Sequence, residues 1–183
     1  MISRRAFLGG STFGSLALLG VGGHYAWQTG RIQLGPADLP DATLPPVPGV
    51  MRDGKPVPGF SSADRDERVL LLNFWASWCP YCRSEHDVLM KLSQNPRLKL
   101  IGIVSDDRES HVAQYLNEHG NPYAQLSMDH QKVVIRAMRQ RGLPTTMLIP
   151  AGSDRVTFRH VGPITEPLIQ PAIASALLPY QVG

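Results

Sequence analysis

Cysteine is scarce in this sequence: 183 residues contain only two, Cys79 and Cys82. A secreted scaffold held together by disulfides needs several cysteines spread along the chain. A structural zinc site usually draws on a second pair of cysteine or histidine ligands, and the six histidines show no paired spacing that would supply one. The two cysteines can therefore act only locally, and we expect no metal site.

An excess of charge of either sign is also absent. The formal net charge is +3, but Arg4 and Arg5 at the N-terminus account for two of the 18 basic residues. Without them, 16 basic residues stand against 15 acidic ones. A domain this close to neutral has little attraction for a phosphate backbone, so we expect no nucleic-acid partner. The hydrophobic content of 43% is that of a folded globular chain.

The N-terminal stretch, residues 1–30, has the order of a signal peptide, because Arg4 and Arg5 precede an uncharged run with an apolar centre. Residues 3–8 resemble the twin-arginine export motif. An uncleaved membrane anchor is the alternative, since the run approaches the ~20 residues that cross a bilayer; a buried helix of the domain is a third. Under the first two interpretations the rest of the chain lies in the periplasm, free or tethered to the inner membrane.

Proline and glycine dominate residues 31–60, which we interpret as a tether followed by loose edge structure. The pattern becomes regular in residues 61–180, which we interpret as the folded domain. It predicts strands at 69–75 and 98–104 and helices at 80–93, 109–119 and 130–140, followed by two strands at 145–149 and 156–161 and a helix within 165–178. This order predicts an α/β protein with a thioredoxin-like fold, a mixed central sheet flanked by helices.

The segment Trp78-Cys79-Pro80-Tyr81-Cys82 follows a predicted buried strand and begins a predicted helix. Free backbone N–H groups at a helix start stabilise a thiolate on Cys79, and Pro80 fits the first turn. Cys82 lies on the same side, close enough to form a disulfide with Cys79, and deeper in the helix, so it should be the more shielded. We predict that Cys79 attacks and Cys82 resolves. An inert disulfide is the alternative, although it would close a very small loop.

A second signal is Gly142-Leu143-Pro144-Thr145-Thr146, which stands just before a predicted strand. Proline in a sheet is confined to edges, bulges and first residues of strands. In thioredoxin-like folds this position carries a cis-proline that faces the disulfide, and we expect Pro144 to be that residue. An ordinary turn is the alternative.

These segments together resemble the CcmG/DsbE family of thiol:disulfide interchange proteins, which act in cytochrome c maturation. The resemblance covers roughly residues 68–165, and its more specific parts are Cys82-Arg83-Ser84-Glu85-His86 and Gly120-Asn121-Pro122-Tyr123-Ala124. It implies an oxidoreductase that keeps the cysteines of apocytochrome c reduced for haem attachment. It also implies a membrane thiol reductase of the DsbD or CcdA type as electron donor, and no cofactor besides the Cys79–Cys82 disulfide.

Acidic residues of the family have counterparts here. Glu85 matches an acid thought to tune the thiols, with a solvated helix-face carboxylate as the alternative. Asp106 and Asp107 match acids that follow the second strand, although capping of the next helix explains at least one of them equally well.

The sequence departs from the family pattern at Thr145, where an acid is common, and at Pro80-Tyr81, which is also the glutaredoxin dipeptide. The direction of electron transfer depends on a reduction potential that residues alone do not determine. A general periplasmic disulfide reductase or oxidase of the thioredoxin/TlpA type is therefore the alternative function. A chaperone-like binding module would be expected to lack one cysteine, and the Thr-x-x-Cys pattern of peroxidases is absent.

Overall fold

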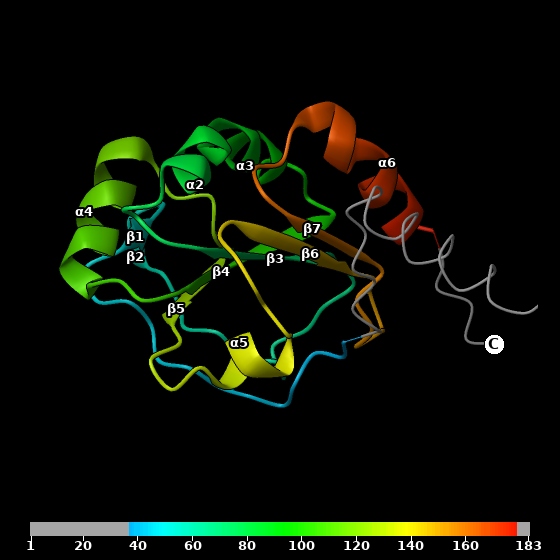
Figure 1. The fold of residues 1–183 in the computed structure, drawn as a ribbon, viewed down its shortest axis with the longest axis horizontal. Helices are drawn as coiled ribbons and strands as arrows, with labels where there is room; N and C mark the ends of the chain where they lie inside the picture. The colour runs from blue at the N-terminus through cyan, green and yellow to red at the C-terminus, as the bar shows by residue number, and fades with distance from the viewer. Residues whose placement is uncertain (1–36, 179–183) are drawn as a thin grey trace, which may run out of the picture. The chain divides into compact units, whose positions relative to one another are not determined.

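A five-stranded mixed sheet forms the centre of the protein, in a computed structural model that describes residues 37–178 (Figure 1). The predicted leader, residues 1–30, lies outside the described residues. The spatial order of the strands is β5-β4-β3-β6-β7, with β3 parallel to β4, β4 parallel to β5, and β6 antiparallel to both β3 and β7. Their bounds are β3 Val69–Trp75, β4 Leu98–Val104, β5 Gln125–Met128, β6 Thr145–Ile149 and β7 Phe158–Val161.

The two central parallel strands are apolar along nearly their whole length because both of their faces are covered. Every residue of β3 and β4 is buried, and the two strands pair in register from Val69 with Leu98 to Trp75 with Val104. Both strands therefore end at the same edge of the sheet. The chain that follows each of them emerges there, which brings residues 76–79 and 105–108 close together.

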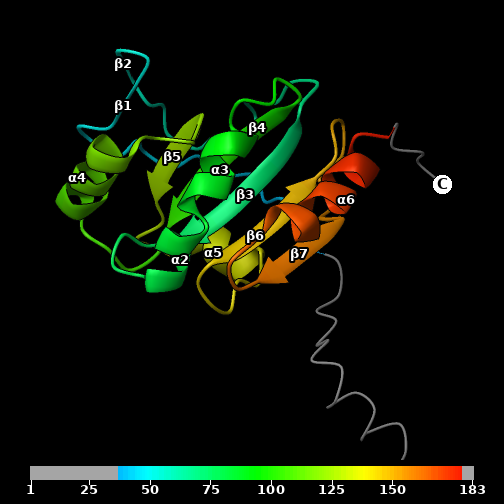
Figure 2. The same ribbon diagram turned by 90° about the horizontal axis from the view of Figure 1, so that it is seen from above.

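Helices cover the two faces of the sheet unequally, as Figure 2 shows. One core cluster on the more heavily covered face joins the sheet to α3, α4 and α6 through residues such as Leu89, Leu116 and Ile169. The opposite face packs against α5 and the N-terminal part of the domain, including Leu39 and Phe60. The helices are α2 Pro80–Ser84, α3 His86–Leu92, α4 Glu109–His119, α5 Val133–Ala137 and α6 Glu166–Ala176.

The structure differs from the expected elements in several places, among them β7, which begins at Phe158 rather than at residue 156. The helix expected over residues 80–93 is divided into α2 and α3 at Glu85, whose carboxylate is bonded to other parts of the fold. The helix expected over residues 130–140 shortens to α5, because Lys132 and Arg139 on either side of it have left-handed backbone angles. Strand β5 was not predicted, since its four residues are half polar and too short to show a period.

Residues 37–60 are more ordered than the expected tether and loose edge. They contain a small hairpin, β1 Met51–Arg52 and β2 Lys55–Pro56, whose turn uses positive φ at Asp53 and Gly54. Val47, Val50, Val57 and Phe60 are all buried in the core. Proline prevents helix in this segment but leaves extended chain free to pack, so the core begins well before residue 61.

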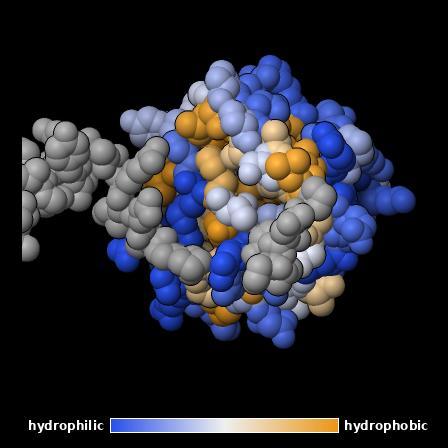
Figure 3. Space-filling view, turned by 90° about the vertical axis from the view of Figure 1, so that its right-hand side faces the viewer, coloured by the Kyte–Doolittle hydropathy of each residue, from blue (hydrophilic) through white to orange (hydrophobic). Residues whose placement is uncertain are grey.

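The β7 side of the domain, viewed in Figure 3, shows apolar residues in the middle of the face with polar residues around them. Exposed apolar side chains of the elements on this side include Val161 of β7 and Leu168 of α6. Strand β7 is the last of the sheet, so the apolar layers of the core reach the surface there. Within residues 37–178, no helix is both long and apolar enough to cross a membrane.

Candidate active site

The two cysteines lie at the start of α2, directly after the turn that follows β3. Cys79 is the N-cap residue with extended backbone angles, and Pro80 occupies the first turn, where its missing N–H is not needed. The Cys82 N–H donates to the Cys79 sulfur over 3.4 Å. Both residues are free thiols in the structure. This geometry brings the two sulfur-bearing residues together in the way the spacing predicts.

The surroundings of the two thiols differ in charge stabilisation rather than in exposure. The expectation that Cys82 is the more shielded is wrong, because Cys79 is 4% and Cys82 is 5% exposed. The Cys79 sulfur nonetheless accepts a hydrogen bond from the Cys82 N–H at the start of the helix, which favours negative charge on this sulfur. Burial, and then the hydrogen bond with Cys79, raise the pKa of the Cys82 thiol far above its usual range. Negative charge is therefore favoured on Cys79 over Cys82.

Glu85 lies at the junction of α2 and α3 and is fully buried, with 0% of its surface exposed. The alternative of a solvated helix-face carboxylate is therefore wrong. Its two oxygens accept hydrogen bonds of 2.8 Å, one from the Asn73 side chain and one from the Ile164 N–H. Burial raises the pKa of Glu85 to about 7, and the two hydrogen bonds limit the rise. A group that changes charge near neutral pH thus lies in the element that carries the thiols.

A buried polar network holds this carboxyl group. The Tyr123 hydroxyl donates to Asn73 Oδ1 over 2.8 Å, which leaves the Asn73 amide NH₂ to face Glu85 and the Thr146 hydroxyl. All four of these residues are buried. Sequence reasoning did not select Asn73, Tyr123 or Thr146 as site residues. A usable signal was present in Asn73, the only polar residue in the strand Val69–Trp75.

Trp78 is the exposed neighbour of Cys79, with 57% of its surface accessible. Its indole N–H donates to the backbone oxygen of Asp106 over 3.0 Å. Next to it, the carboxylate of Asp107 accepts from the Ser77 N–H over 2.6 Å. The N-cap residue of α4 is Arg108, whose own side chain makes no capping hydrogen bond, but the other oxygen of Asp107 accepts from the Arg108 N–H over 2.7 Å. Asp107 therefore links the start of α4 to the turn that leads to Cys79.

The peptide bond between Leu143 and Pro144 is cis. The register that pairs Phe74 with Thr145 places this loop at the sheet edge where β3 ends and the turn to Cys79 begins. Leu143 packs against the core cluster that contains both cysteines. Thr145, at the position where acids are common in the resembled family, is buried and donates to the Gly142 backbone oxygen. Within residues 37–178, no group of histidine, cysteine and acidic side chains is arranged to hold a metal ion.

Comparisons with known proteins agree with this geometry. The Redoxin family matches residues 37–178, so the chain belongs to that family, whose thioredoxin-like fold and thiol chemistry define the class of protein. Within it, the chain is a thiol:disulfide oxidoreductase of the DsbE type.

Named relatives support that assignment. The chain is 34% identical over 143 residues to the thiol:disulfide interchange protein DsbE of Yersinia pestis, covering 71% of this chain and 75% of that one. It is also 34% identical over 154 residues to DsbE of Escherichia coli K12, covering 80% and 82%. Among solved structures, a thioredoxin-family thiol:disulfide interchange protein from Chlorobium tepidum is similar, with a TM-score of 0.63 and 28% identity. That match covers 78% of this chain and 97% of the other.

Proposed function

We propose that this protein reduces the cysteines of apocytochrome c before haem attachment, using Cys79 and Cys82 as the reacting dithiol. The observation that carries the proposal is the unequal environment of the two thiols, in which Cys79 accepts a backbone hydrogen bond while burial holds Cys82 protonated. The choice of apocytochrome c rests on the resemblance to the CcmG/DsbE family.

The exchange proceeds in two balanced steps. The Cys79 thiolate attacks one sulfur of the partner's disulfide, forming a mixed disulfide and releasing the partner's other sulfur as a thiolate. Cys82 then loses its proton and attacks the Cys79 sulfur, which forms the Cys79–Cys82 disulfide and releases the partner's second thiolate. The partner gains two electrons and, after protonation, two thiols. A membrane thiol reductase of the DsbD or CcdA type then returns the protein to its dithiol form.

The second step needs an acceptor for the Cys82 proton, and Glu85 is suited to that role. Its pKa of about 7 allows the carboxyl group to take up or release a proton near neutral pH. Its negative charge also contributes to the raised pKa of Cys82, so the two groups interact. In this proposal Trp78, Pro80 and Pro144 are supporting residues that surround the reacting sulfurs and do not themselves react.

Trapping in cells tests the substrate. Cys82→Ala stops the second step, so partners should accumulate as mixed disulfides on Cys79, where mass spectrometry identifies them. Cys79→Ala is the matched control and should trap almost nothing. We expect apocytochrome c, or its maturation partners, among the trapped proteins, and cells lacking the protein should lose covalently bound haem.

A general periplasmic disulfide reductase or oxidase is the second candidate, favoured by the buried Thr145 where the resembled family commonly has an acid. Many unrelated secreted proteins in the trap, with normal cytochrome levels in the deletion strain, would establish it instead. Either function requires export. Residues 1–35 fused to a reporter should carry it out of the cytoplasm, and a reporter retained in the cytoplasm would contradict the periplasmic location.

A further inference from the structure

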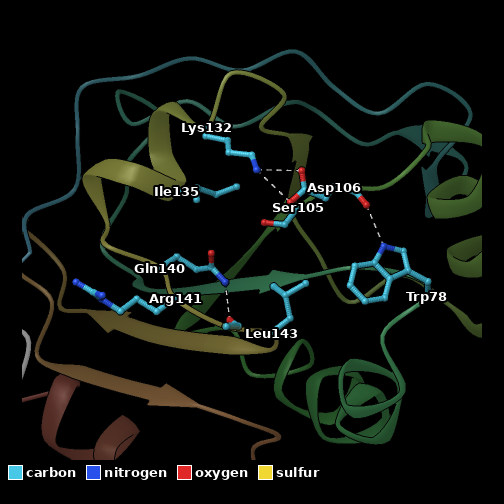
Figure 4. Close-up of a pocket in the computed structure, with 9 residues that line it drawn as sticks. Trp78, Ser105, Asp106, Lys132, Ile135, Gln140, Arg141 and Leu143 are labelled. Atoms are coloured by element: carbon cyan, nitrogen blue, oxygen red, sulfur yellow. Dashed lines mark hydrogen bonds and ion pairs between the residues drawn. The ribbon is translucent and has the colours of Figure 1, made fainter. Parts of the chain in front are cut away.

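A pocket of about 340 Å³ lies between the turn after β4 and the chain that joins α5 to β6 (Figure 4). Trp78, the residue before Cys79, lines one side of it, and Leu143, the residue before Pro144, lines another. Ile135 of α5 adds a third apolar side chain. A partner chain whose cysteine reaches Cys79 therefore has room to place a neighbouring side chain in this pocket.

The chain along one side of the pocket carries several basic residues and no acidic ones. Residues 130–153 contain no aspartate or glutamate but contain Lys132, Arg136, Arg139 and Arg141. Residues 37–178 as a whole carry 15 basic and 15 acidic side chains, since only Arg4, Arg5 and Arg31 precede them. The local excess is therefore a property of this segment and not of the domain's total charge.

Most of these cations lack a carboxylate partner among the residues that the structure describes. Lys132 pairs with Asp106 over 3.2 Å across the pocket, as the dashed lines in Figure 4 show. None of the ion pairs formed among residues 37–178 involves Arg136, Arg139 or Arg141. All three arginines are exposed, and Arg141 extends from the rim of the pocket.

Positive charge is crowded enough here to affect a neighbouring group. Arg159 of β7 donates to the backbone oxygen of Met138 over 2.8 Å, which fixes the end of the chain that carries Arg139 and Arg141. Burial, and then the charge of Arg139, lower the pKa of Arg159. A carboxylate bound at this rim would relieve that repulsion, whereas another cation would add to it.

We propose that this pocket binds partner segments that carry an aspartate or glutamate next to the reacting cysteine, and that Arg141, with Arg139, selects them. The occupant is a polypeptide because the apolar walls of the pocket include Trp78, the residue before Cys79, while Arg141 lies at its rim. This inference rests on the proposed function only in taking Cys79 as the attacking residue. It names a preference that would apply to any protein substrate or electron donor.

Synthetic peptides test the preference. Each carries one C-x-x-C disulfide flanked on both sides by aspartate, asparagine or lysine, and the rate constant for its reduction by the dithiol protein is measured by stopped-flow. The wild-type protein should reduce the aspartate peptide roughly two- to fivefold faster than the asparagine peptide, the size expected of one exposed ion pair. The lysine peptide should be slowest, and added salt should bring the three rates together.

Variants assign the preference to the pocket. Arg141→Gln should bring the aspartate-to-asparagine rate ratio close to one, and Arg141→Lys should retain most of it. Arg97→Gln is the matched control: Arg97 is exposed and precedes β4, so it lies at the opposite end of that strand from residues 105–108. It removes the same charge and should leave the ratio unchanged.

Several results would overturn the proposal. They are equal rates for the three peptides with the wild-type protein, a ratio that persists in Arg141→Gln together with Arg139→Gln, and a ratio lost equally in Arg97→Gln. Binding to phosphatidylglycerol vesicles that depends on Arg141, with equal peptide rates, would show that the rim binds lipid instead. These outcomes are separate from the trapping experiment, which can fail for apocytochrome c while the peptide preference holds.

Discussion

Replacing Glu85 by glutamine keeps the size of the side chain and removes the one group of the buried network that changes charge between pH 5 and 9. In the folded protein the pKa of Glu85 rises from 4.5 to about 7 because the carboxyl group is buried. The folded state therefore binds this proton more tightly than the unfolded chain does. Its contribution to stability is complete below pH 4.5 and is lost as the pH rises through 7.

The size of the effect follows from the two pKa values. Each unit of difference is worth about 1.4 kcal/mol, so ionised Glu85 lowers the free energy of unfolding by about 3 kcal/mol at pH 9 and by less than ~1 kcal/mol at pH 5. The side-chain oxygen of the glutamine accepts from Asn73, but its NH₂ group faces the Ile164 N–H, so that two donors meet. The lost hydrogen bond lowers the free energy of unfolding by about 1–3 kcal/mol at every pH. Between pH 5 and 9 the variant should therefore gain about 2–3 kcal/mol relative to the wild type.

Urea unfolding of the disulfide form, followed by circular dichroism at several pH values, measures this difference without titration of the thiols. His86, whose pKa is lowered by burial, titrates in both proteins and cancels in the comparison. Glu67→Gln, an exposed carboxylate in the loop before β3, is the control and should follow the wild type. If Glu85→Gln and the wild type lose stability in parallel from pH 5 to 9, Glu85 does not titrate as the structure implies.

Three further predictions concern the buried network, the N-terminal part of the domain and the two thiols. Tyr123→Phe leaves Asn73 Oδ1 without its donor and should lower the free energy of unfolding by about 1–3 kcal/mol, as measured by urea unfolding; no change would show that the bond is dispensable. Phe60→Ala should lower it by about 3–5 kcal/mol, because Phe60 is buried, whereas a loss below about 1 kcal/mol would return residues 37–60 to a loose edge. In the reduced protein Cys79 should react with iodoacetamide faster than Cys82, as followed by peptide mass mapping, since the pKa of Cys82 is raised; equal rates would contradict the assigned roles.

Elements with strong local patterns were predicted to the residue. The ranges 69–75, 98–104, 109–119 and 145–149 all match strands or helices of the structure, because continuous apolar runs and a helical period are visible within a short window. Strand β5 and the buried chain around Phe60 depend on distant partners instead. The Leu126 N–H donates to the Pro58 oxygen, a contact between segments that no local pattern connects.

The residues of the candidate site also fall into those that the sequence reveals and those that it does not. Cys79, Cys82 and Pro144 were found from spacing and from resemblance, since their positions relative to strands are visible in the sequence. The hydrogen-bond network of Glu85 was not, because Tyr123 and Thr146 lie 50 and 73 residues from Asn73 in the sequence. A single sequence shows that Asn73 is unusual in its strand, but not which group it serves.

The buried network around Glu85 also limits how this protein can change over evolution. Each of its four side chains uses a donor or acceptor that another supplies, so a single apolar substitution leaves a buried polar group without a partner. Substitutions at these positions should therefore be correlated among related sequences. Where position 85 has become apolar, we expect position 73 to have lost its asparagine and position 123 its hydroxyl, so that the four residues are inherited as one unit. A search for such joint changes needs only aligned sequences, and it would separate relatives that keep an ionisable group beneath the thiols from those that have dispensed with it.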